Sequence, residues 1–403
     1  MYFPFRTFFA LACAQFLIHG SSADESDESV RIPPPNSDTT DLKTLRLVQV
    51  IFRHGDRTPV VQYPKDPLQD ESLWPEGFSA LTKKGKKMQL DLGKYLRARY
   101  DGFLSRAYKP LEISVQSSSA DRAIMSALAN LAGLFPPTEE DPKSMWDEDI
   151  KWQPIPVHTL TDADDNYINF KAYCPRFKEL KEEYIRRSEF AIGVNSDPAN
   201  QELYSFLSNH TGWDVKDFEQ VSDLHDTLLI QSNYHLPLPN WTHEVFPERT
   251  GKLFDLPFDT RVQVPTEEVQ KVKCGPLLRR LVTNMDAARD SSSGSGKPNK
   301  AKMYMYSGHD STSSILLGTL KVFDTQFPAY ASTVLLEMHE LPDRNNNSDY
   351  YLKVFFRNST TVPPFELNIP SCGYPCRLDT LKESYKNIMV DGPEWRAACE
   401  KAS

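Results

Sequence analysis

The stretch IFRHGDRTP, residues 51–59, places two arginines, a histidine and an aspartate within five residues. It overlaps the end of the apolar run LRLVQVIF (45–52), which is typical of a strand buried on both faces. A buried strand does not need so much charge at its end, and a dense charged run there is costly unless it binds something. The stretch therefore predicts an anion site immediately after the strand.

Two later segments have the same form, a predicted strand followed by polar and chemically capable residues. LEISVQ (111–116) is followed by Asp121 and Arg122, and KMYMYSGHD (302–310) ends in Gly-His-Asp. In open α/β sheets, ligands bind outside the carboxyl ends of the strands, where helix N-termini also point. We therefore expect these residues, which lie far apart in the sequence, to meet the 51–59 stretch at one edge of a sheet.

The remaining patterns predict helices and a late hairpin. Apolar residues approximate helical spacing from Leu81 to Tyr100, and AIMSALANLAGLF (123–135) predicts a helix that two prolines stop. STVLLEMHEL (332–341) and DYYLKVFFRN (349–358) predict a hairpin with its turn near DRNNNSD.

The middle of the chain differs from its two ends. Residues 138–290 are mostly polar, with helical patterns such as CPRFKELKEEYIRRSEF, and SSSGSGKPNK (291–300) predicts a flexible connector. We therefore expect an α/β domain formed by residues 44–137 and 291–403, with 138–290 as a mainly helical insertion or cap.

The balance of charge limits the class of partner. The formal net charge is −9 at pH 7, which argues against nucleic acid as the main partner and against non-specific adhesion to anionic membranes. A local basic cluster, rather than the whole surface, must attract any anionic substrate.

The N-terminus has the pattern of a signal peptide over residues 1–23. Arg6 precedes a short apolar stretch that ends at Ile18, and small residues lead to Ala23. The alternative is an N-terminal anchor helix, but the apolar stretch is short for spanning a bilayer. Residues 24–43 are acidic and rich in Ser and Pro, which predicts a disordered leader. We expect a soluble protein outside the cytosol, without a membrane anchor.

The cysteines and glycosylation motifs agree with an oxidising compartment. Cys13 leaves with the signal peptide, so an odd number of cysteines remains and one has no partner within the chain. Cys372 and Cys376, separated by Gly-Tyr-Pro, can close a tight loop. Asn-X-Ser/Thr motifs predict glycosylated surface loops at Asn209, Asn240, Asn346 and Asn358.

The chemistry of a phosphate monoester fits the residues at the three strand ends. Its hydrolysis needs cations around the phosphate oxygens, a nucleophile in line and an acid for the leaving oxygen. His54 is a competent nucleophile when neutral, and neighbouring arginines should lower its pKa and keep it neutral in acid. Asp310 is the natural general acid, and further contacts to the phosphate would come from Arg53, Arg57, Arg122 and His309.

Each of these residues has a simpler explanation when it is taken alone. A His-Asp pair such as His309-Asp310 usually has no functional role, and Arg122 could form a salt bridge at a helix start. The dense run RHGDRTP is harder to explain without a ligand.

RHGDRTP resembles the RHGxRxP signature of the histidine acid phosphatases, within the superfamily that includes the phosphoglycerate mutases. Further motifs resemble animal acid phosphatases of the prostatic and lysosomal type, over a range from about residue 44 to 399 with the middle third poorest. These motifs are YPKDP (63–67), WPEGF (74–78), LTKKG (81–85), DRAIMSALANLAGLFPP (121–137), CPRF (174–177), MYSGHD (305–310), YAS (330–332) and RNST (357–360).

The resemblance implies a doubly wound α/β fold with a mostly parallel sheet flanked by helices and a smaller α-helical cap. By the RHG motif, His54 would carry the phosphoryl group, and by the HD motif Asp310 would protonate the leaving group. The phosphate would be held by Arg53, Arg57, Arg122 and His309. The resemblance implies neither a metal nor another cofactor, and the remaining histidines are scattered.

The resemblance also implies two disulfides, Cys174–Cys399 and Cys372–Cys376. Where relatives have a third, Thr333 stands in place of one cysteine, and Cys274 is expected to be a free or an intermolecular thiol. Ser79-Ala80 replaces a usual Gly-Gln near the implied site.

We therefore expect a secreted, metal-independent acid phosphatase acting on small phosphate monoesters. The alternative is a secreted small-ligand-binding protein with weak or no catalysis, and a third possibility is a phytase-like or mutase-like enzyme. A lysosomal location is less favoured than secretion, and a homodimer is possible because relatives commonly form one.

Overall fold

The computed structural model describes residues 41–139, 141–254, 256, 266–293, 300–323, 327–341 and 349–400. The predicted signal peptide, nearly all of the predicted leader, the motif at Asn346 and the turn of the late hairpin lie outside these residues. Most of the predicted connector also lies outside them. None of the helices in the described residues is both long and apolar enough to cross a membrane.

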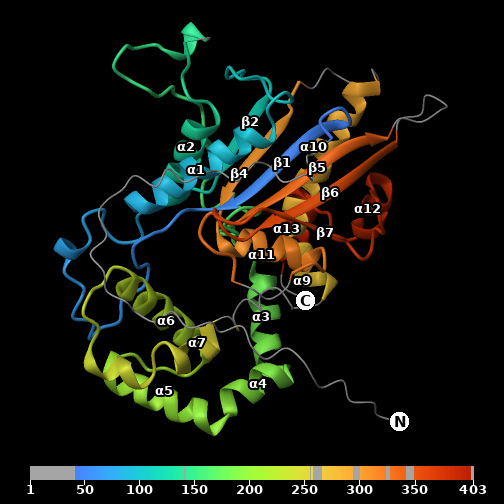
Figure 1. Ribbon diagram of the computed structural model, residues 1–403. Coiled ribbons are helices and arrows are strands. Elements are labelled where there is room, and N and C mark those ends of the chain that lie inside the picture. Colours follow the sequence, from blue (N-terminus) through green and yellow to red (C-terminus); the bar gives the residue numbers. More distant parts are fainter. Residues whose placement is uncertain are drawn as a thin grey trace. The chain divides into compact units, whose positions relative to one another are not determined.

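Strands from both ends of the described chain form one mixed sheet (Figure 1). Its order is β3-β2-β4-β1-β5-β6-β7, and β8 also pairs with β6. The first four strands in this order are parallel, and β5 to β8 pair antiparallel with their neighbours. The strands are β1 (Leu45–Arg53), β2 (Ile113–Ser117), β3 (His158–Thr159), β4 (Met303–Gly308), β5 (Thr333–Leu341), β6 (Asp349–Arg357), β7 (Phe365–Leu367) and β8 (Cys376–Arg377).

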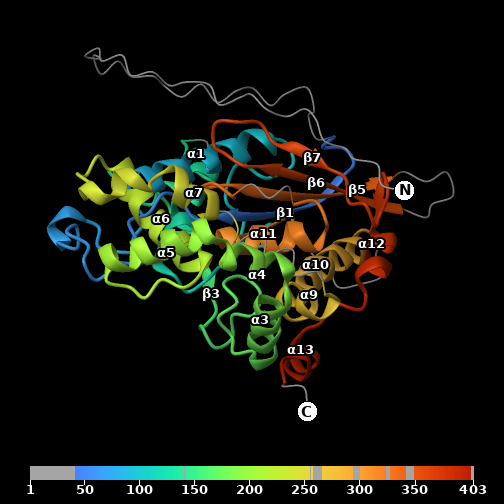
Figure 2. The same ribbon diagram turned by 90° about the horizontal axis from the view of Figure 1, so that it is seen from below.

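Helices cover both faces of the sheet, as Figure 2 shows with the strands between α1 on one side and α10 and α11 on the other. Val48, Val50 and Phe52 of β1 pack in one core cluster with α1 (Lys83–Arg99) and α2 (Asp121–Leu134). Leu47 and Ile51 point to the other face, because side chains alternate along a strand. They share a second cluster with α10 (Gly275–Ser293), α11 (Asp310–Thr319) and α12 (Leu378–Tyr385). Burial on both faces is what the apolar run predicts.

A group of helices in the middle of the chain has its own apolar core. This core includes Leu207, Phe218 and Leu228 and joins α4 (Glu189–Ser196), α5 (Pro198–Thr211), α6 (Phe218–Asn233) and α7 (Glu248–Phe254). Tyr63 from the segment after β1 is part of it. Nearer the sheet lie α3 (Pro175–Arg187), α9 (Glu267–Lys273) and α13 (Gly392–Cys399), and short 3₁₀ helices span Glu71–Leu73, Pro142–Ser144 and Asn240–Glu244.

Two elements of the 138–290 stretch belong to the sheet layers rather than to this helical group. β3 pairs with β2, and α10 contributes Leu277 and Leu281 to the core beneath β1. The division into domains at residues 137 and 291 remains a prediction.

Both disulfides that the resemblance implies are present. Cys174 and Cys399 join the start of α3 to the end of α13, and Cys372 and Cys376 close a short loop before β8. Cys274 is the free thiol among the described cysteines, and its side chain is fully buried. Burial raises its pKa to about 12, so the thiol is neutral and inaccessible to a second molecule in this structure.

Candidate active site

The ends of β1 and β4 bring two histidines together. The two strands are parallel neighbours, with Arg53 opposite Gly308, so the residues that follow them lie side by side. The ring centres of His54 and His309 are 5.5 Å apart in an edge-to-face arrangement. Strand register, rather than proximity in the sequence, therefore creates the centre of the site.

The protonation of His54 follows from its hydrogen bond. Its Nδ1 lies 2.8 Å from Gly55 O, and because a carbonyl only accepts, Nδ1 carries the proton. Nε2 of the neutral ring is then unprotonated. Burial lowers the pKa of His54 well below its ordinary value, and Arg53 is the next cause. The sequence predicts this direction from the arginines, but loss of water around the 2% exposed side chain is the larger effect.

Two helices hold the turn after His54. The N–H of Gly55 donates to Ser126 Oγ on α2 at 3.1 Å. Gly55 also lies directly against Gly85 in α1, where an added Cβ on Gly55 would come within 2.3 Å of Gly85 O. Thr82, the N-cap of α1, donates from Oγ1 to Asp56 Oδ2 at 2.6 Å. The nucleophile candidate therefore stands on a turn with little freedom to move.

Arg53 is the last residue of β1, and its side chain is 1% exposed. Its Nη1 donates to Pro328 O at 2.7 Å, and its guanidinium carbon lies 4.3 Å from the centre of the Tyr330 ring. Its Nη2 lies 3.0 Å from Asp310 Oδ2, in an ion pair without the alignment of a hydrogen bond. Within the described part of the chain, Nε has no hydrogen-bond partner either. Buried N–H groups of a cation that lack hydrogen-bond partners favour the binding of an anion.

Arg57 and Arg122 bring two more cations to the same place. Arg57 Nη2 donates to Asp226 Oδ2 on α6 at 3.0 Å. Arg122 lies in the first turn of α2, and among the residues that the structure describes its buried Nε has no hydrogen-bond partner. Burial, followed by the charge of Arg57, lowers the pKa of Arg122, and Asp310 opposes this shift. Like charges are crowded here, and a bound anion would relieve the crowding.

His309 and Asp310 come from the end of β4 and the start of α11. Nε2 of His309 is hydrogen-bonded to Ser118 Oγ at 2.9 Å, and the side chain is 5% exposed. Burial lowers the pKa of His309 to about 3, with the charge of Arg122 as the next cause. The N–H of Ser311 donates to Asp310 Oδ1 at 2.7 Å. The Asp310 side chain is 21% exposed, so its carboxyl group is accessible to a ligand.

All the predicted catalytic and phosphate-binding side chains lie close to one another. The charges that lower the pKa of His54 come from Arg53, His309, Arg122 and Arg57. The charge of Asp310 in turn acts on Arg122. Two neighbours were not predicted. Asp226 lies on an ordinary amphipathic helix, and Tyr330 had only the YAS motif as a signal. Asp56 Oδ2 has other partners, since it accepts from Thr82 Oγ1 and also from Tyr234 OH at 3.0 Å.

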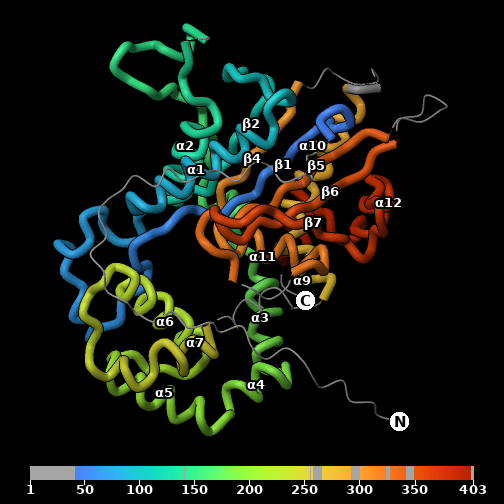
Figure 3. Tube along the Cα trace, viewed as in Figure 1, coloured from blue at the N-terminus to red at the C-terminus, as the bar shows by residue number. Residues whose placement is uncertain are grey.

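The chain path explains how the helical group reaches the site. After β1 the chain runs toward α6 and returns to α1 (Figure 3). Along this path Thr227 Oγ1 of α6 donates to Val61 O at 2.8 Å, and Gln231 Nε2 donates to Asp66 Oδ2 at 2.8 Å. The described residues contain no cluster of three or more His, Cys, Asp or Glu side chains that could hold a metal ion.

Comparison with known proteins agrees with this geometry. The family model of the histidine phosphatase superfamily, branch 2, matches residues 44–357. The chain belongs to this superfamily. It is therefore a phosphatase by family, and the predicted resemblance is confirmed.

Relatives of this branch 2 member include animal acid phosphatases. Lysosomal acid phosphatase of Xenopus laevis is 34% identical over 364 residues, which cover 90% of this chain and 80% of the relative. Prostatic acid phosphatase of Rattus norvegicus is 34% identical over 375 residues, which cover 92% of each chain.

Solved structures share the fold at lower identity. The Hafnia alvei phytase in complex with myo-inositol hexakis sulphate has a TM-score of 0.62 at 18% identity, covering 89% of this chain and 99% of that one. The predicted fold class, a mostly parallel sheet flanked by helices, is confirmed. The structure adds that the sheet is mixed, because β5 to β8 pair antiparallel.

Proposed function

We propose that this protein is a metal-independent acid phosphatase that hydrolyses small phosphate monoesters through a phosphohistidine on His54. One observation carries the proposal. The unprotonated Nε2 of His54 belongs to a ring whose pKa is lowered by burial first and then by charges that include Arg53, Arg122 and Arg57. Of these arginines, Arg53 and Arg122 have buried N–H groups without hydrogen-bond partners in the described residues.

The arginines would hold the three non-bridging oxygens of the phosphate, since a planar guanidinium matches phosphate geometry and stays charged. His309 would add an N–H contact. The negative charge of a bound phosphate would raise the pKa of His309, which burial lowers to about 3.

In the first step, the lone pair of His54 Nε2 would form the N–P bond while the bond from phosphorus to the leaving oxygen breaks. The proton of the Asp310 carboxyl group would go to that oxygen, which leaves as an alcohol or phenol. In the second step, water would attack phosphorus, its proton would return to Asp310, and the N–P bond would break. Phosphate is released and both side chains regain their starting states.

The low pKa of His54 favours acidic conditions. An unburied histidine would be protonated below about pH 6.5 and would lose its nucleophilic lone pair. His54 keeps that lone pair at lower pH. Lower pH also favours the protonated form of a carboxyl group, which the proposed role of Asp310 requires.

The test is hydrolysis of an aryl phosphate at acidic pH, with chelator present, by wild type, His54→Ala and the control His158→Ala. His158 is an exposed residue of β3. We expect wild type and the control to be active and His54→Ala to lose at least about a thousandfold in kcat. Alkaline quenching of a reaction with ³²P-labelled substrate should trap label on wild type and on the control, but not on His54→Ala.

The alternative of a ligand-binding protein makes a different prediction. Folded wild type would then bind inorganic phosphate in a calorimetric titration without turning over any monoester. Activity that disappears with chelator would contradict the metal-independent mechanism.

We also propose that the protein is secreted. The signal-peptide pattern and the two disulfides support this, because disulfides persist in oxidising compartments. Recovery from culture medium with an N-terminus near Asp24 is the expected result, and retention in lysosomes would contradict it.

Endoglycosidase treatment should lower the mass of the protein, because Asn209 and Asn240 are exposed. A homodimer remains a prediction that light scattering can test.

A further inference from the structure

We propose that Asn358 is a positioning residue for the phosphate-binding Arg53, and that it acts through the loop of residues 327–332. This inference rests on the proposed function, because it assigns Arg53 to phosphate. Asn358 follows β6 directly and is half-buried. The sequence alone predicts only a glycosylation site there.

The loop encloses the guanidinium group of Arg53. Pro328 O accepts the hydrogen bond from Arg53 Nη1 at 2.7 Å. The ring centres of Phe327 and Tyr330 lie 4.7 Å and 4.3 Å from the guanidinium carbon. Aromatic faces attract a cation, so these contacts fix where the remaining N–H groups of Arg53 point.

The loop is also bonded to the backbone beside the nucleophile candidate. Arg53 N donates to Ser332 O at 3.0 Å, and Ala331 N donates to His54 O at 3.1 Å. Ala331 has a φ of 59°, which lies in the left-handed region that residues with a Cβ adopt at an energetic cost. A loop with such a residue needs restraint from its surroundings to keep one conformation.

Asn358 supplies that restraint with a single carboxamide. Its Oδ1 accepts from Ala329 N at 3.0 Å, and its Nδ2 donates to Phe327 O at 3.5 Å. These two backbone groups flank Pro328, which has no N–H of its own with which to hold its position. The carboxamide thus holds the loop on both sides of the carbonyl that anchors Arg53.

Loss of this restraint should act on ligand binding before it acts on the fold. Arg53 would sample more side-chain conformations, and binding phosphate would then cost the entropy of ordering it. The expected signature is weaker binding of phosphate together with a lower kcat/KM.

A glycan on Nδ2 would leave one N–H and the acceptor oxygen in place, so the experiment must separate the carboxamide from the glycan. Thr360→Ala removes the glycosylation motif and keeps Asn358. Asn358→Ala removes both. Asn358→Asp removes the motif and the donor but keeps an acceptor for Ala329 N.

The four proteins are compared well below their melting temperatures by kcat, KM and the inhibition constant of inorganic phosphate. We expect Asn358→Ala to lower kcat/KM and to weaken phosphate inhibition by about tenfold, the scale of one or two hydrogen bonds. Asn358→Asp should lie between that variant and wild type, and Thr360→Ala should match wild type.

Two outcomes would overturn the proposal. Equal losses in Asn358→Ala and Thr360→Ala would assign the effect to the glycan, and a lower melting temperature with unchanged kcat/KM and inhibition would assign Asn358 a structural role only. If Asn358→Ala does not fold, Asn358→Asp decides between the same outcomes. An inactive wild type would contradict the proposed function instead, and phosphate affinity measured by calorimetry would still test Asn358.

Discussion

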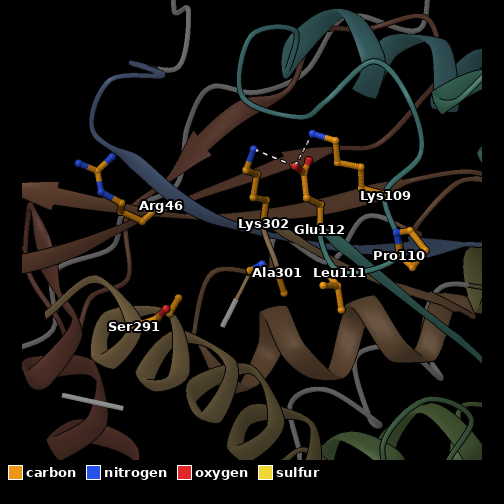
Figure 4. Close-up of a pocket in the computed structure, with 10 residues that line it drawn as sticks. Arg46, Lys109, Pro110, Leu111, Glu112, Ser291, Ala301 and Lys302 are labelled. Carbon is orange, nitrogen blue, oxygen red and sulfur yellow. Dashed lines mark ion pairs between the residues drawn. The ribbon is translucent and has the colours of Figure 1, made fainter. Parts of the chain in front are cut away.

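The two ends of the parallel strands both gather cations, yet in different states. Before β1, β2 and β4 lies a cavity of about 570 Å³ lined by residues that include Arg46, Lys109 and Lys302 (Figure 4). Glu112 pairs with Lys302 at 3.4 Å and with Lys109 at 3.5 Å, while Arg46 pairs with Glu340 at 2.6 Å. After the same strands, Arg53 is fully buried and Arg122 is half-buried, and both keep buried N–H groups without hydrogen-bond partners in the described residues.

The two ends differ in how much binding free energy a ligand could gain. At the cavity, side chains that are 59% (Lys109), 36% (Lys302) and 34% (Arg46) exposed already have water and carboxylates around them. A ligand there would exchange one set of good partners for another, so it would gain little. At the candidate active site, Arg53 and Arg122 have lost water without full replacement, so an anion would gain much more. Buried and incompletely paired charge identifies the site better than empty volume does.

Among the changes that test this comparison of the two ends, the largest expected effect is at Arg122. We predict that Arg122→Ala lowers kcat/KM by about a hundredfold or more, because the proposed mechanism would lose a donor to the charge of the transition state. Arg106→Ala is the matched control, since Arg106 is an exposed arginine paired with Asp101. Steady-state kinetics on one aryl phosphate measures both. A loss in kcat/KM of less than threefold in Arg122→Ala would mean that the buried arginines matter no more for activity than exposed ones.

The next effect separates the proton donor from the cations. Asp310→Asn keeps an oxygen near Arg53 but has no proton to give. We predict a loss of about a hundredfold with an alkyl phosphate and of about tenfold or less with nitrophenyl phosphate, whose leaving group needs little protonation. Equal losses on the two substrates would assign Asp310 to phosphate binding alone.

The low pKa of His309 predicts a dependence of stability on pH. The pKa of His309 is about 3 in the folded chain and about 6.5 in the unfolded chain. Between these two pH values the unfolded chain therefore binds a proton at His309 that the folded chain does not bind. Its contribution to stability is fully present above pH 6.5 and falls as the pH is lowered toward 3. At pH 5 the loss is about 2 kcal/mol.

Urea unfolding at pH 5 and pH 7 tests this. In His309→Gln, the difference in unfolding free energy between the two pH values should be smaller than in wild type by about 2 kcal/mol. The exposed His158→Gln should match wild type. An unchanged difference in His309→Gln would mean that His309 is not buried as a neutral ring.

The smallest effect belongs to the opposite end. Lys109→Met should change kcat/KM by less than about twofold, because surface ion pairs contribute little and the ligand binds elsewhere. The same assay with added salt serves as the check. A large loss would mean that the cavity of Figure 4 takes part in the reaction.

The sequence predicted the elements whose signal is local. The apolar run at 45–52 became β1, and the helical spacing at 81–100 became α1, because burial on two faces and on one face leave distinct patterns. The predicted helix at 123–135 begins two residues earlier, so Asp121 and Arg122 form its first turn. The residues at the strand ends could be predicted to meet because parallel strands end at one edge.

The features that the sequence did not predict depend mainly on contacts between residues far apart in the chain. Asp226 reaches Arg57 across 169 residues, and Asn358 reaches Ala329 from the end of a different strand. Each lies in a stretch that reads as an ordinary helix or a glycosylation motif. The strand β8, Cys376–Arg377, is also too short to leave a periodic pattern.

The contact between Gly55 and Gly85 has a consequence for a mutational scan. An added Cβ at Gly85 would come within 2.2 Å of Asp56 O, so neither glycine accepts a side chain without moving the backbone. Both positions should therefore be as intolerant as the residues assigned to the chemistry, although neither has a side chain to offer a substrate. In such a map, intolerance at these two glycines would mark the support of the nucleophile rather than the nucleophile itself.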